Sequence, residues 1–134
     1  LFFNGFIRYW LLIPHLRKDA KIKNKVSDLI SRNIILSTTS INVAELYLGA
    51  YLSKKKNENL NSVEELISRL DIITFITDHG RIYGELKAKL QKRGTIINEL
   101  DIFIAAIVLE RDTTLITRNI RHFEKMSGLK IEKW

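Results

Sequence analysis

The apolar residues of this chain fall into two kinds of segment. In four segments they recur every three or four positions, which predicts amphipathic helices over residues 19–32, 40–54, 57–70 and 78–92. Short apolar runs, typical of buried parallel strands, predict strands at residues 1–3, 34–37, 72–75, 114–117 and 129–131. Because strands alternate with helices, we predict an α/β fold, with a central, mostly parallel sheet of about four to five strands flanked by helices.

One further helix, predicted over residues 98–110, is apolar on every side. A helix without a wet face belongs in a core, where neighbouring elements cover it. Its first turn nevertheless carries two carboxylates, Glu99 and Asp101. A charge near a core is costly unless something compensates it. These two acids are therefore candidates for a functional site.

The chain of 134 residues is long enough for one domain with a proper core, and we predict a single domain over residues 1–134. Its first 16 or so residues are atypical, since residues 6–16 fit neither pattern and Pro14 limits any helix there. No apolar run approaches the ~20 residues of a membrane span, so we expect no membrane contact. Nor does the apolar start have the cleavage site of a signal peptide.

Composition narrows the class of function further. The chain has no cysteine, which excludes disulfides and thiolate metal sites and fits a cytoplasmic location. The net charge of +7 favours partners that carry phosphate, although simple solubility is an equally good explanation. No glycine-rich phosphate loop is present, which counts against a nucleotide-binding enzyme.

A third candidate acid, Glu45, lies among apolar residues of the predicted 40–54 helix. One plain interpretation is a capping box, in which Asn42 caps the helix and Glu45 completes the motif, and Asn98 with Asp101 has the same spacing. The alternative is that both acids point into one crevice, because each lies near a helix start that follows a strand or turn. Converging carboxylates repel each other unless a divalent cation neutralises them.

Polar residues also follow the predicted 114–117 strand. Asn119 is either a helix N-cap or an oxygen ligand for a hard cation, and Thr117 offers a hydroxyl beside it. Arg118 either contacts a phosphate or lies in solvent. We interpret His122 as a packing or surface residue, since the three histidines of the chain lack the spacing of a zinc site.

Two clusters of basic residues are also present. Residues 54–56 are three consecutive lysines, which are most often a solvated helix end. The second cluster, which is able to follow a nucleic-acid backbone, consists of Lys87, Lys89, Lys92 and Arg93.

Three of these segments together resemble PIN-domain ribonucleases. Residues 37–50 look like the helix that carries the second acid of that family, and residues 99–106 look like its third-acid helix. Residues 114–119, followed by His122 and Phe123, are similar to its fourth-site strand. The most similar subgroup is the VapC toxins of type II toxin–antitoxin systems. The resemblance covers residues 34–134, and three motifs in order are more specific than any one of them.

The resemblance implies an endoribonuclease that depends on Mg²⁺ or Mn²⁺ and cleaves RNA phosphodiesters. It gives Glu45 and Asp101 the second and third acid positions, as catalytic residues and metal ligands. Asn119 stands where many relatives place a fourth acid. Glu99, Thr117 and Arg118 are assigned to the surroundings of the ligands or to substrate contacts. The resemblance also implies a homodimer and a cognate antitoxin protein as partner.

The first acid of the family is missing at the expected place. Asn4, which follows the predicted 1–3 strand, is the best positional match for this ligand. An amide oxygen is neutral, so a hard cation would bind less tightly. Our hypothesis is a shifted reading frame near Asn4 and Gly5, which would restore an aspartate. The alternative function is a non-catalytic RNA- or antitoxin-binding module on the same fold.

Overall fold

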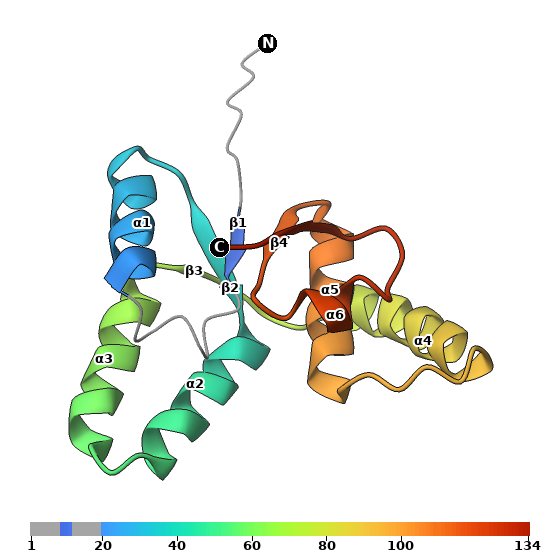
Figure 1. Ribbon diagram of the computed structural model, residues 1–134, viewed down its shortest axis with the longest axis horizontal. Coiled ribbons are helices and arrows are strands. Elements are labelled where there is room, and N and C mark those ends of the chain that lie inside the picture. Colours follow the sequence, from blue (N-terminus) through green and yellow to red (C-terminus); the bar gives the residue numbers. More distant parts are fainter. Residues whose placement is uncertain (1–8, 12–19) are drawn as a thin grey trace.

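Five short strands form one parallel sheet in the computed structural model, which describes residues 9–11 and 20–134 (Figure 1). The strands are β1 (Tyr9–Leu11), β2 (Leu36–Thr39), β3 (Asp71–Ile73), β4 (Thr114–Ile116) and β5 (Lys130–Glu132). Their order is β3-β2-β1-β4-β5, and every neighbouring pair is parallel. This confirms the α/β prediction. In such a sheet, ligands bind beyond the carboxyl ends of the strands where the order reverses, which is between β1 and β4.

Helices cover both faces of this sheet (Figure 1). They are α1 (Ala20–Ser31), α2 (Ser40–Leu52), α3 (Lys56–Ser68), α4 (Thr77–Lys92), α5 (Glu99–Arg111) and α6 (Ile120–Phe123). One core joins α1, α2 and α3 to Leu36 and Ile116, and the other joins α4, α5 and α6 to Ile73 and Leu115. The successive residues Leu115 and Ile116 serve opposite cores, because side chains along a strand alternate between faces. No helix in the described ranges is long and apolar enough to cross a membrane.

Helix α5 is buried, as its apolar sequence predicts. The six residues from Ile102 to Val108 other than Phe103 are at most 1% exposed. Phe103 is covered by an aromatic cluster, since its ring stacks on Tyr83 with centroids 4.2 Å apart and meets Phe75 edge-on at 5.2 Å. A helix held this firmly by its neighbours fixes the position of any side chain in its first turn.

The amino-terminal part of the chain differs from the sequence prediction. The predicted strand at residues 1–3 and the candidate ligand Asn4 lie outside the described residues. The strand at the centre of the sheet is β1, which the sequence pattern did not predict, and its Tyr9 pairs with both Leu36 and Thr114. The assignment of Asn4 as a metal ligand therefore stays a prediction.

Candidate active site

Asp101 lies in the first turn of α5, at the edge where β4 ends. Its side chain is 16% exposed, and its Oδ2 is 2.7 Å from Nδ1 of His122 on α6. The helix is capped by Asn98, whose Oδ1 accepts a hydrogen bond from the backbone N–H of Leu100 at 2.9 Å. The carboxylate of Asp101 is therefore engaged by a histidine from another element, and the plain capping explanation does not account for it.

Asn119 joins the same cluster. Its amide Nδ2 is 2.7 Å from Nδ1 of His122, the nitrogen that also meets Asp101. One ring nitrogen cannot donate and accept at once, so Nδ1–H donates to the Asp101 carboxylate when Asp101 is ionised. The amide then presents its oxygen to the ring, an orientation that a simple flip of the amide supplies. Asp101, Asn119 and His122 thus form one hydrogen-bonded group, which we call the Asp101 cluster.

Thr117 fixes the backbone of Asn119 in this cluster. It is buried, and its Oγ1 accepts a hydrogen bond from the backbone N–H of Asn119 at 3.0 Å. Its own N–H donates to the carbonyl of Glu132 at 3.1 Å, which ties the turn after β4 to β5. Thr117 therefore shapes the turn that presents Asn119.

His122 was predicted to be a packing or surface residue, and its place in the Asp101 cluster was not predicted from the sequence. The spacing of His122 to the other histidines excludes a zinc site, whereas its spacing to Asn119 indicates that these two side chains meet. Asn119 is the N-cap of α6 and His122 lies three residues on, a spacing at which side chains meet at a helix start. The contact with Asp101 spans 21 residues of sequence, and no local pattern predicts it.

Glu45 lies half-buried in the second turn of α2. The N-cap of this helix is Thr39, whose Oγ1 accepts from the backbone N–H of Asn42 at 3.1 Å. The predicted capping box of Asn42 and Glu45 is therefore wrong, because the helix begins earlier. Ile41 packs against the core that contains α5, and residues four apart share a helix face, so Glu45 lies on the side of α2 that faces α5.

The other predicted residues are not drawn into the Asp101 cluster. Glu99 accepts a hydrogen bond from Nζ of Lys87 on α4 at 2.7 Å, so it joins α5 to α4. Arg118 is exposed in the turn between β4 and α6.

The donor set bears on the metal that the resemblance implies. Among the described residues there is no group of three or more histidine, cysteine or acidic side chains that could hold a metal ion. The oxygens of Asp101, Glu45 and Asn119 are nevertheless the type that hard cations prefer. Mg²⁺ is usually bound by one or two carboxylates together with waters and the phosphates of its substrate. The residues present fit a metal held in that way.

Comparison with known proteins identifies the family. The PIN domain family model matches residues 11–129. The chain is 36% identical over 107 residues to ribonuclease VapC2 of Rickettsia felis, and this match covers 80% of each chain. It is 35% identical over 117 residues to the tRNA(fMet)-specific endonuclease VapC of Salmonella typhimurium, and this match covers 84% of this chain and 89% of the relative. The crystal structure of Rickettsia felis VapBC2 bound to promoter DNA superposes with a TM-score of 0.86 at 32% identity, covering 95% of this chain and 98% of that one. The chain therefore belongs to the PIN-domain family and, within it, to the VapC proteins.

Proposed function

We propose that this chain is a metal-dependent endoribonuclease that acts as the toxin of a toxin–antitoxin pair. Relatives that match most of its length are named ribonucleases, and one is named a tRNA(fMet)-specific endonuclease. The structural observation that carries the proposal is Asp101, a partly buried carboxylate held by His122 in the first turn of a rigid helix. It lies beyond the carboxyl end of β4, where α/β sheets bind their ligands.

Asp101 and Glu45 are the proposed ligands of Mg²⁺ or Mn²⁺, and Asn119 adds an amide oxygen. When bound, the ion supplies an activated water and stabilises the leaving oxygen of the RNA phosphodiester. The protein itself orients the side chains that would bind the ion. The positive end of the α5 dipole lies next to the Asp101 carboxylate, and the hydrogen bond from His122 fixes the orientation of that carboxylate.

We also propose an antitoxin as protein partner, in the cytoplasm, and a homodimer of this chain. The similar structures from Rickettsia felis and Salmonella typhimurium are VapBC complexes bound to DNA. On α2 the apolar side chains of Leu48, Tyr51 and Leu52 are 59%, 60% and 78% exposed. Three exposed apolar side chains at helical spacing support a surface that another chain covers.

The test is RNA cleavage by the purified chain with Mg²⁺, with Mn²⁺ and with a chelator. We expect cleavage with metal only, and its loss in Asp101→Asn and in Glu45→Gln. Asp112→Asn is the matched control, because it makes the same change at the other end of α5, where Asp112 is exposed and paired with Lys130. A chain that bound RNA without cleaving it in either metal would instead support the non-catalytic alternative.

A further inference from the structure

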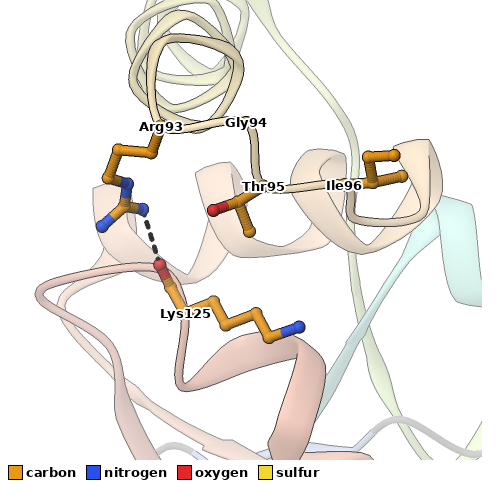
Figure 2. Close-up of a pocket in the computed structure, with 5 residues that line it drawn as sticks. All are labelled: Arg93, Gly94, Thr95, Ile96 and Lys125. Carbon is orange, nitrogen blue, oxygen red and sulfur yellow. Dashed lines mark hydrogen bonds between the residues drawn. The ribbon is translucent and has the colours of Figure 1, made fainter.

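A basic cavity of about 540 Å³ lies at the surface between the end of α4 and the turn after α6 (Figure 2). It is lined by Arg93, Gly94, Thr95, Ile96 and Lys125. One wall is the loop between α4 and α5, and the other is the turn after α6. We propose that this cavity binds a backbone phosphate of the RNA substrate next to the cleavage site. The proposal rests on the proposed function and adds a substrate-positioning site to it.

The α4–α5 wall is held in place by its own backbone. Gly94 has φ +67° and ends α4, and its N–H donates to the carbonyl of Gln91 at 3.0 Å. The N–H of Thr95 donates to the carbonyl of Leu90 at 2.9 Å. These two bonds with a left-handed glycine form a Schellman motif, which fixes the chain direction after a helix. The loop therefore presents Arg93 and Thr95 in a defined geometry.

The opposite wall is fixed as well. Lys125 lies between Phe123 and Met126, which are 0% and 3% exposed and anchor the turn in the core. Nη2 of Arg93 donates to the backbone carbonyl of Lys125 at 2.9 Å and joins the two walls. Figure 2 shows this bond, with the hydroxyl of Thr95 pointing into the space between the two basic residues.

Both cations of the cavity are available to an anion. Within residues 20–134, neither Arg93 nor Lys125 forms an ion pair with a carboxylate. Glu124, next to Lys125 in sequence, is the nearest acid along the chain and is exposed. A guanidinium and an ammonium across an open cavity are the groups that proteins use to hold phosphate.

Both walls of this cavity are close in sequence to residues of the Asp101 cluster. Lys125 follows His122 of the Asp101 cluster by three residues, in the turn after α6. Thr95 and Ile96 lead directly into the first turn of α5, where Asp101 lies. Carboxylates repel the RNA backbone, so cations beside them are needed to hold the strand in register.

A second basic cavity provides the contrast. It measures about 340 Å³ and is lined by residues 54–58, which run from the loop after α2 into the first turn of α3. Here an acid belongs to the lining, since Nζ of Lys55 lies 3.9 Å from Oε2 of Glu58. This loop follows the carboxyl end of α2, whereas the α2 residues nearest the sheet edge are those of its first turn (Figure 1). Lys54 therefore serves as a matched control for Lys125.

The experiment measures binding of a short fluorescent single-stranded RNA by anisotropy, in chelator so that no cleavage occurs, across a range of salt. The salt slope is taken as the steepness with which log affinity falls as log salt rises. For single strands, each lost phosphate contact reduces this steepness by about 0.7. We expect Lys125→Gln to weaken binding several-fold and to lower the slope by about 0.7, equally for RNAs of different sequence. Arg93→Gln with Lys125→Gln should lower it by about 1.4. Lys54→Gln should leave the slope unchanged.

Lys125→Gln is the cleaner variant, because its side chain has no hydrogen bond among the described residues, and Arg93→Lys separates charge from the bond to the Lys125 carbonyl. A full salt slope in the double variant would overturn the proposal. If the oligomeric state of that variant, measured by sedimentation, also changed, the cavity would be a contact between protein chains and the proposal would again be overturned. Wild-type cleavage of the same RNA with metal tests the proposed function separately and can succeed while this inference fails.

Discussion

Helix α5 carries a histidine–carboxylate pair at each end, and the two pairs differ in which partner is buried. At its start, Asp101 is 16% exposed and His122 is 44% exposed, with 2.7 Å between Oδ2 and Nδ1. Near its end, Glu110 is 34% exposed and His79 only 1%, with 3.2 Å between Oε2 and Nε2. The same chemistry is thus placed in opposite environments on one rigid helix.

The pair at the end of α5 is fully committed to the fold. Nδ1 of His79 accepts the backbone N–H of Ile76 at 3.0 Å and so caps the start of α4. That bond leaves the proton on Nε2, which donates to Glu110. The ring also lies 5.6 Å from that of Phe75. Both nitrogens of His79 are used, and the pair joins α4 to α5.

The pair at the start of α5 keeps capacity for a ligand. Both described contacts of His122 are made by Nδ1, and Asp101 still has Oδ1. A partly buried carboxylate with an exposed histidine lies within reach of solutes, whereas a buried histidine does not. A pair in which both histidine nitrogens are hydrogen-bonded stabilises the fold. A pair at the sheet edge that still has polar atoms without a hydrogen bond is the candidate for ligand binding and catalysis.

The largest effect is expected from Asp101→Asn. Cleavage should fall at least about 100-fold, because even residues outside the metal ligands cost 10–100-fold in related sites. The melting temperature should stay near that of the wild type, since Asn98 still caps α5. Cleavage and thermal melting on one sample test this. Retained cleavage would remove Asp101 from the site.

Breaking the other pair should give the reverse result. His79→Ala should lower the free energy of unfolding by about 2 kcal/mol, because it removes a helix cap, a hydrogen bond to a carboxylate and buried packing. His79→Asn should lose less, since its amide oxygen can still accept the N–H of Ile76. Denaturant unfolding measures both variants. Cleavage per folded molecule should not change, and a loss there would contradict the assignment of His79 to the fold.

His122 should have an intermediate effect on cleavage and little on stability. We expect His122→Ala to reduce cleavage about tenfold, because Asp101 loses the donor that orients it. His122→Asn should recover part of the rate, since its amide nitrogen takes the place of Nδ1. Rates of the two variants, compared at equal metal concentration, decide this. Equal rates for alanine and asparagine would mean that the hydrogen bond to Asp101 has no role.

The smallest effect on stability is expected from a substitution of Glu85. This acid is exposed to solvent, and so it extends the comparison beyond the two histidine–carboxylate pairs. On α4 its carboxylate accepts a hydrogen bond from Lys89 at 3.0 Å, and this bond and the lysine charge lower the pKa of Glu85 below its ordinary 4.5. A lowered pKa contributes stability above the ordinary value and loses it as pH falls through the folded value. Glu85→Gln should therefore slightly flatten the fall in stability as the pH drops below the ordinary pKa of 4.5. Unfolding curves across that range test the sign.

The sequence by itself determined the elements whose signal is local and repeated. The buried α5 follows from an apolar run with no wet face, and the parallel sheet follows from strands that alternate with helices. The motifs around Glu45 and Asp101 also carry the family, because they are short and continuous. Each of these patterns is complete within one segment of chain.

Only the tertiary structure decided the features that depend on distant partners. A three-residue strand such as β1 has no period of its own, and it is stabilised by the ladders of Leu36 and Thr114 on either side. The N-cap of α2 is Thr39 and not the predicted Asn42, because the helix begins directly after β2. The contact of Asp101 with His122 exists because β4 and α6 fold back onto α5, and no spacing along the sequence encodes that distance.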